Sequence, residues 1–371
     1  MRIVAISALC CVVSAAAAAG QPVPSERLVH GPVLAGGRVV WGELAGGQES
    51  LRLASPELTT RVVYRPISDD RVGQWLAASA SLLAFERVGP TCPPQPGVVC
   101  PEAWDVLAGR LTGPFRPLAP KEQCFSSWES SPFDAFGRLL AEKVSSCTTP
   151  SEIRVVVHDL RTGRRRTIAR LAGETGCCAG VAIAGRYVAW AQDSDASLVV
   201  FDLRSNRVAY RERVGTPLGP HRIAGLDVEA DGKSVVTTTD GRVLWFGLDG
   251  RAHRLRLPAS GPLVRIGRGR ILLDRKEPGG ASALVLADLA GRISTIARPA
   301  KPLRLRGDFD FDGSRVTWAS DRISETHVDC PPRGIMRPCI VRESGVTTIW
   351  LARVGGRPRP LARLPFADEP R

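Results

Sequence analysis

Residues 185–214 read GRYVAWAQ (185–192), SLVVFDL (197–203), RSN (204–206) and RVAYRERV (207–214). The first two runs are rich in β-branched and aromatic residues, which favours strands, and a short polar turn separates them from a basic third run. A short apolar segment and a tight turn precede the phrase, where Gly185 supplies the positive φ that a short hairpin needs. The phrase therefore predicts four successive antiparallel strands.

The same phrase recurs in seven units along the 371 residues. The second strands of the units are predicted at 38–43, 81–87, 138–143, 186–192, 233–238, 270–275 and 315–319. The third strands are predicted at 50–55, 102–107, 153–160, 197–203, 242–248, 282–289 and 346–352. Four strands per unit predict an all-β, seven-bladed β-propeller over residues 31–365, in which Trp41, Trp190 and Trp318 pack between blades. Irregular insertions in the first three units leave six or eight blades open.

The N-terminus has the pattern of a secretory signal. Arg2 is its only charge, an apolar run follows, and the tract Ala15–Ala19 offers a small-residue cleavage site. We predict a signal peptide at residues 1–19 and a secreted or cell-envelope protein. The alternatives are an uncleaved anchor, because residues 3–19 reach the short limit of a spanning helix, or lipidation at Cys10 or Cys11. A linker at 20–30 and a tail at 366–371 would flank the propeller.

The formal net charge is +13, and only five of the 50 basic residues are lysine. A basic surface attracts phosphate polymers, nucleic acid or acidic lipids. The arginines are spread over many turns, so we predict solvated surface charge and no specific nucleic-acid partner. The densest cluster is RTGRRR (161–166), and equivalent turns carry Arg204, Arg207, Arg251, Arg292 and Arg357. These turns would form a basic rim that could rest on an anionic cell envelope.

Blade topology sorts the connections onto two faces. Turns between strands one and two and between strands three and four emerge on one face, and the other connections emerge opposite. The long insertions all belong to the second class and are predicted at 88–101, 120–134, 144–152, 172–178 and 320–345. They hold Cys92, Cys100, Cys124, Cys147, Cys177, Cys178, Cys330 and Cys339. We predict that this cysteine-bearing face binds the partner, with Trp128 as its aromatic anchor.

An even number of cysteines in an exported chain predicts disulfides. Proximity favours Cys92–Cys100 and Cys330–Cys339. The other four either form Cys124–Cys147 beside a vicinal Cys177–Cys178 pair, or bond Cys124 and Cys147 one each to the adjacent cysteines. Zinc binding is disfavoured because no CxxC pair exists. A redox switch at Cys177 and Cys178 is a further alternative.

The segment DFDFDG (308–313) matches the start of a calcium loop. Alternation would place Asp308, Asp310 and Asp312 on one side as ligands of a hard cation. Ala319 and Val316, however, stand where a calcium loop would need a further oxygen ligand. The turn from Asp227 to Gly232 is similar, which indicates an ordinary hairpin signature. We predict no cofactor, with calcium at the three aspartates as the alternative.

Two phrases, VVVHDLRTGRRRTI (155–168) and VVFDLRSNRV (199–208), resemble those of WD-repeat and TolB-like propellers. In that family an Asp follows the third strand, and here the matching residues are Asp105, Asp159, Asp202 and Asp288. We expect these carboxylates to cap the next turn. The Gly-His dipeptide that opens WD repeats is missing, so a secreted bacterial TolB-like or WD-like propeller fits better.

Catalytic motifs are sparse. The chain has no GxSxG, and its five histidines form no HExxH or repeated ligand pattern. We predict a monomeric, noncatalytic scaffold that binds a protein or cell-envelope ligand. The alternative is a propeller enzyme, such as a lyase, a lactonase or a glycan-cleaving protein, with residues gathered at the central channel from several blades.

Overall fold

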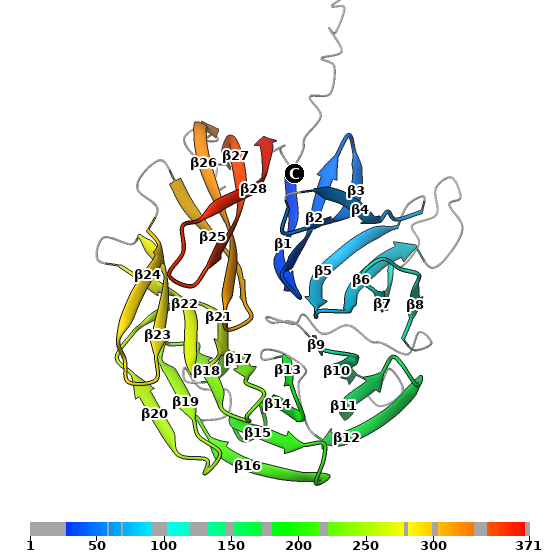
Figure 1. The fold of residues 1–371 in the computed structure, drawn as a ribbon, viewed down its shortest axis with the longest axis vertical. Helices are drawn as coiled ribbons and strands as arrows, with labels where there is room; N and C mark the ends of the chain where they lie inside the picture. The colour runs from blue at the N-terminus through cyan, green and yellow to red at the C-terminus, as the bar shows by residue number, and fades with distance from the viewer. Residues whose placement is uncertain are drawn as a thin grey trace, which may run out of the picture.

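The computed structural model describes residues 27–57, 59–67, 70–90, 102–118, 132–145, 152–172, 180–215, 222–277, 281–298, 303–329 and 340–367. These residues form strands β1–β28 and no helix. The strands make seven sheets of four antiparallel strands, each from one continuous segment, arranged as blades around an axis (Figure 1). The predicted all-β, seven-bladed propeller is confirmed.

Within each blade the strands run outward from the axis in chain order. The innermost strands are β1 (Arg27–Ala35), β5 (Arg71–Ala78), β9 (Phe133–Phe136), β13 (Val181–Ala184), β17 (Ile223–Val228), β21 (Ala259–Gly267) and β25 (Leu303–Phe311). The second strands are β2 (Arg38–Ala45), β6 (Leu82–Pro90), β10 (Leu139–Ser145), β14 (Tyr187–Gln192), β18 (Ser234–Thr238), β22 (Arg270–Lys276) and β26 (Arg315–Asp329).

The third strands are β3 (Gln48–Ala54), β7 (Glu102–Arg110), β11 (Glu152–Asp159), β15 (Ser197–Asp202), β19 (Val243–Phe246), β23 (Ser282–Asp288) and β27 (Ile340–Arg353). The outermost strands are β4 (Thr60–Tyr64), β8 (Phe115–Pro117), β12 (Arg164–Ala172), β16 (Arg207–Arg213), β20 (Ala252–Leu255), β24 (Ile293–Ala297) and β28 (Arg359–Ala367). The propeller therefore runs from Arg27 to Ala367.

The hydrophobic core lies between neighbouring blades. One cluster joins Leu198 and Tyr210 of blade 4 to Val236 and Phe246 of blade 5. The second-strand residues Trp41, Trp190 and Trp318 are buried in such clusters, which confirms their predicted packing. Burying one large apolar side chain contributes about 1.5–3 kcal/mol, so each blade is stabilised mainly by its neighbours.

The ring closes between blade 7 and blade 1 without exchange of a strand. The innermost strands β25 and β1 lie side by side, and the backbone N–H of Leu34 donates to Asp310 Oδ2 at 2.7 Å. Arg306 donates to the carbonyl of Leu28 at 2.9 Å. An apolar cluster that includes Trp41 and Ile349 fills the space between the two blades. Hydrogen bonds between side chains and backbone, together with apolar packing, thus hold the ends of the ring together.

Two sequence expectations were wrong in detail. Asp105 lies in the middle of β7 and forms an ion pair with Arg87, so it does not cap a turn. Asp159, Asp202 and Asp288 do accept backbone N–H groups of the following turn, as predicted. The expected insertion at 320–345 is mostly a long hairpin, because β26 and β27 stay paired as far as Asp329 and Ile340.

Within the described part of the chain, no helix is long and apolar enough to cross a membrane.

Candidate functional site

A cavity of about 810 Å³ follows the propeller axis and is lined by residues of all seven innermost strands. Several of these strands have an irregular register at or next to a glycine, as at Gly225 in β17 and Gly307 in β25. Gly225 is required there, because a Cβ at that position would lie 1.8 Å from the carbonyl oxygen of Pro262 in the next blade. Glycine thus lets neighbouring strands approach each other around the axis.

Three aspartates occupy equivalent places on alternate blades around this cavity: Asp134 in β9, Asp227 in β17 and Asp310 in β25. Each accepts a backbone N–H from the innermost strand of the next blade. The donors are Ile183 at 2.8 Å for Asp134, Ile266 at 2.7 Å for Asp227 and Leu34 at 2.7 Å for Asp310. We call Asp134, Asp227 and Asp310 the axial aspartates.

Arg265 of β21 provides the positive charge among the axial aspartates. Its Nε donates to Asp310 Oδ1 at 2.9 Å, and its side chain is only 26% exposed. Burial opposes a charged guanidinium, but the three carboxylates together raise the pKa of Arg265. The arginine therefore stays charged and ties blade 6 to blade 7.

The other two axial aspartates have strongly shifted pKa values. Burial raises the pKa of Asp134 to about 6 and that of Asp227 to about 7, although Arg265 acts in the opposite direction. Each also accepts the backbone N–H of its own following residue, Ala135 or Val228. Both oxygens of each carboxyl group are thus bonded to backbone N–H groups. This geometry fastens blades together, and the pKa values would also permit proton transfer near neutral pH.

The predicted calcium ligands lie at or near the tight-turn end of β25, but each has its own partners. Asp308 pairs with Arg306 at 3.2 Å, and Asp310 pairs with Arg265. Asp312 accepts the backbone N–H groups of Ser314 and Arg315 and so shapes the hairpin turn. Phe309 and Phe311 are buried on the opposite side, as the alternation predicted. Among the described residues, no three His, Cys, Asp or Glu side chains are arranged to hold a metal ion.

The strands that flank the predicted insertions end on one face of the ring. This follows from the antiparallel order within each blade, which brings Pro90, Ser145 and Asp329 to the same end as the first residues of the innermost strands. The links between strands one and two, and between three and four, are tight turns at the other end. Trp128 and all eight predicted disulfide cysteines lie outside the described residues.

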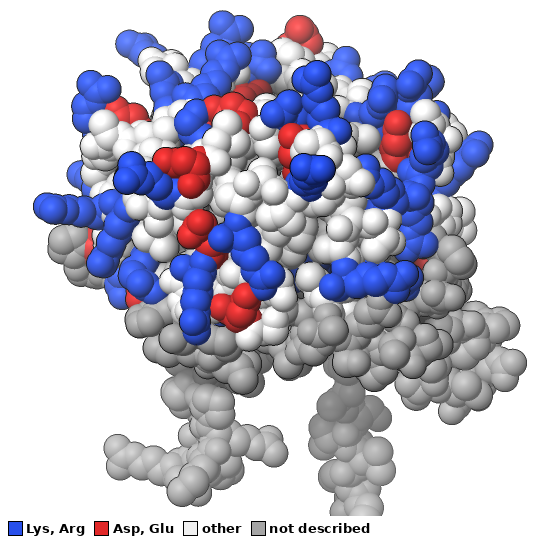
Figure 2. All heavy atoms as spheres, turned by 90° about the horizontal axis from the view of Figure 1, so that it is seen from below, with Lys and Arg blue, Asp and Glu red and all other residues white. Residues whose placement is uncertain are grey.

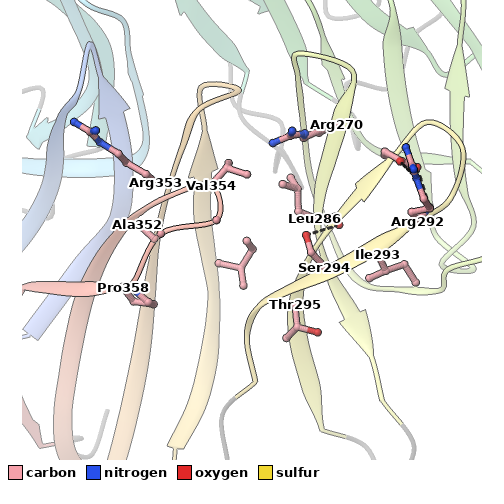
Figure 3. A pocket seen from close by; sticks show the side chains of 14 residues that line it. Arg270, Leu286, Arg292, Ile293, Ser294, Thr295, Ala352, Arg353, Val354 and Pro358 are labelled. Atoms are coloured by element: carbon pink, nitrogen blue, oxygen red, sulfur yellow. Dashed lines mark hydrogen bonds and ion pairs between the residues drawn. The ribbon is translucent and has the colours of Figure 1, made fainter.

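A second cavity of about 490 Å³ lies between the outer parts of blades 6 and 7 (Figure 3). Arg270, Arg292 and Arg353 are among its lining residues. The Arg292 guanidinium pairs with Asp288 at 2.6 Å, and Arg353 extends away from the other two arginines in Figure 3. The Ser294 hydroxyl donates a hydrogen bond to the backbone carbonyl of Leu286. These polar groups do not converge, so the axial cavity is the better candidate site.

Sequence reasoning missed Asp134, Asp227 and Arg265. A signal was present, because all three axial aspartates shortly precede the glycine of the first hairpin turn, at Gly137, Gly232 and Gly313. Their backbone partners lie in other blades, as far as 276 residues away for Asp310 and Leu34. A repeat pattern within one unit does not reveal such a bond.

No protein-family model and no curated protein matches the chain. Among solved structures, it is similar to a puromycin hydrolase, with 16% identity, a TM-score of 0.53, and coverage of 92% of this chain and 54% of that one. The S511A mutant of puromycin hydrolase complexed with PGG gives 14% identity, a TM-score of 0.51, and coverage of 92% and 54%. A puromycin-hydrolyzing peptidase of Mycobacterium tuberculosis gives 13% identity, a TM-score of 0.43, and coverage of 87% and 58%.

The chain spans about half the length of these solved structures. At this level of identity the likeness concerns the fold alone. The fold and the comparisons together establish a seven-bladed β-propeller.

Proposed function

We propose that this chain is an exported, noncatalytic scaffold that binds a protein or cell-envelope ligand on the face from which its long connections emerge. The observation that carries this proposal is that the connections at the two ends of the ring differ in length. The described connections at one end are tight hairpin turns, and the strand ends that flank the long, cysteine-bearing segments lie at the other. Variable connections on a rigid scaffold are the usual place for recognition.

The use of the axial carboxylates supports binding over catalysis. Asp134 and Asp227 each have both oxygens occupied by backbone N–H groups, and Asp310 is shared between Leu34 and Arg265. A catalytic carboxylate needs an oxygen that can reach the substrate. The convergence of titratable groups on the axis therefore fits a role in fastening neighbouring blades together.

A pull-down from the native envelope fraction tests the proposal with a matched pair of variants. Trp128→Ala changes an aromatic in the connection between β8 and β9, which the proposal assigns to the binding face. Leu248→Ala changes a side chain that is 52% exposed in a tight turn of blade 5. We expect Trp128→Ala to reduce the captured ligand at least tenfold and Leu248→Ala to leave it unchanged. Loss of capture in Leu248→Ala alone would reverse the assignment of the two faces.

The axial cavity supports a second candidate, an enzyme with a dispersed site. The pKa values of about 6 and 7 for Asp134 and Asp227 are those of acid–base groups that work near neutral pH. A screen against lactones and acidic glycans tests it. Turnover that is abolished in Asp227→Asn but kept in Asp231→Asn, with a pH profile that bends near 7, would establish catalysis. Without turnover in the native protein, this candidate fails.

Several finer assignments belong to this proposal. The chain would be a TolB-like or WD-like propeller, released after Ala19 as a monomer, with Cys92–Cys100 and Cys330–Cys339 as disulfides. Mass mapping of the mature protein under non-reducing conditions tests the cleavage site and the pairs together. Calcium at Asp308, Asp310 and Asp312 is tested by calorimetric titration.

A further inference from the structure

We propose that the outer surface of blades 3 and 4 binds a linear phosphate-bearing polymer. The surface is formed by β12, β16 and the turns that precede them. It carries the exposed side chains of Arg161, Arg164, Arg165, Arg166, Arg170, Arg204, Arg207, Arg211 and Arg213, which we call the arginine wall. In Figure 2, which is seen from below Figure 1, where β12 and β16 lie, Lys and Arg side chains crowd the described surface. The inference is independent of the proposed function, because it concerns another surface.

The wall is continuous across the boundary between the two blades. Arg166 of β12 donates to the side chain of Asn206, in the turn that leads into β16. The same guanidinium lies 5.7 Å from the ring centre of Phe201 in blade 4. These contacts join β12 to the turn that precedes β16, so the arginines of both outermost strands follow one stretch of the outer edge of the ring.

Part of the wall's charge has no counter-charge among the described residues. Arg211 forms an ion pair with Asp195, and Arg213 donates to the carbonyl of Gly215. For Arg164, Arg165 and Arg207, no ion pair or side-chain hydrogen bond is found within the described residues. Exposed guanidinium groups without a counter-charge are available to a ligand, and they match phosphate with two parallel hydrogen bonds.

Protection of strand edges does not account for the arginines. Charged residues commonly guard exposed edges against pairing, and every outermost strand of the ring has such an edge. β12 contains four arginines and β16 contains three, whereas β28 contains two, β4, β8 and β20 contain one each and β24 contains none. The excess is confined to adjacent blades, which indicates a local purpose.

The spacing on the strands favours an extended chain as the ligand. Side chains on one face of a strand repeat every ~6.7 Å, so Arg164 and Arg166 on β12 and Arg211 and Arg213 on β16 form short rows. A flexible polymer with phosphates at a similar interval can contact several of them at once.

The rest of the surface disfavours two other anions. Tyr210, the aromatic residue of β16, is buried, so the wall offers no stacking surface for nucleic-acid bases. Val208 is the large apolar side chain that β16 exposes, and β12 exposes none, which is little for insertion into a membrane. The wall therefore fits a phosphate polymer without bases or acyl chains.

The test compares two triple variants of equal charge. Arg164→Ala/Arg165→Ala/Arg207→Ala removes three wall arginines. Arg61→Ala/Arg116→Ala/Arg363→Ala removes three exposed arginines from β4, β8 and β28. Binding of long-chain inorganic polyphosphate is measured at several salt concentrations. We expect the wall variant to bind about tenfold or more weakly, with a salt slope reduced by about 2, and the control variant to bind within about twofold of the native protein.

Three further probes identify the ligand class. These are orthophosphate, an oligothymidylate and vesicles of an acidic phospholipid. Weaker binding of all three than of polyphosphate is expected. Equal weakening in the two triple variants would overturn the proposal, because net charge alone would then explain binding. Preference for the oligonucleotide or the vesicles, or absence of polyphosphate binding at low salt, would overturn it as well.

Discussion

The axis of the propeller and the arginine wall use charge in opposite ways. On the axis, Asp134, Asp227 and Asp310 are surrounded by protein and bond to the backbone of the next blade. On the wall, Arg164, Arg165 and Arg207 point into solvent. The difference teaches that charge density alone does not indicate the role of a charged residue. A few buried carboxylates hold the ring together, whereas many exposed guanidinium groups contribute little to its stability.

Removal of an axial carboxylate is the largest expected effect. Asp227→Ala leaves the backbone N–H groups of Ile266 and Val228 without their acceptors, at about 1–3 kcal/mol each. We expect the unfolding free energy in urea to fall by about 4 kcal/mol in total. Asp249→Ala is the control, because that carboxylate caps an exposed turn at Arg251. Equal losses in both variants would mean that the axial position is not special.

A change of pH acts on the same carboxylates. The folded-state pKa values of Asp134 and Asp227, about 6 and about 7, lie above the ordinary value of 3.8. The native state keeps these protons at pH values where the unfolded chain has lost them, so stability falls as pH rises from about 4 through 7. Carboxylates with lowered pKa values, such as Asp159 and Asp288, lose their contribution only in more acidic solution.

We expect urea unfolding between pH 5 and pH 7.5 to show a decline of about 3 kcal/mol in the native protein, since each pKa unit corresponds to about 1.4 kcal/mol. Asp227→Asn should flatten this decline. A native protein that becomes more stable over this interval would contradict the assigned direction.

The close approach of innermost strands gives a smaller effect. In Gly225→Ala the added methyl would meet the Pro262 carbonyl, and both strands must shift. Overpacking of this kind costs about 2 kcal/mol. Gly261→Ala is the matched control, because a Cβ there meets no atom within 4 Å. The melting temperatures of the two variants should therefore differ by several degrees. Equal melting temperatures would show that β17 and β21 are not in close contact at Gly225.

The wall arginines should have the smallest effect on stability. Arg164→Ala and Arg165→Ala each remove an exposed side chain, so each is expected to change the unfolding free energy by less than about 0.5 kcal/mol. Urea denaturation of the single variants measures this. A loss above about 1 kcal/mol would show that the wall supports the fold and would weaken the contrast with the axis.

The sequence predicted the strands because inner ones such as β14 and β15 are short apolar runs, buried on both faces and rich in β-branched residues, and tight turns bound them. Its failure at 320–345 has a physical cause, since residues 322–328 of β26 are mostly exposed and lack an apolar alternation. Asp105 was misplaced because its role was carried over from the Trp-Asp dipeptide of the resembling family, whereas in β7 the strand continues to Arg110. The axial aspartates were not predicted because their hydrogen-bond partners are backbone groups of other blades, which the sequence pattern of one unit does not reveal.

The closure of the ring by side chains has a consequence for how the molecule can be rewired. Strands β1 and β28 are in contact, so the described chain starts and stops at the same boundary between blades (Figure 1). A circular permutant that links Ala367 to Arg27 and opens the chain between β16 and β17 would keep every sheet whole. In such a permutant the blades would keep their places in the ring although their order along the chain had changed.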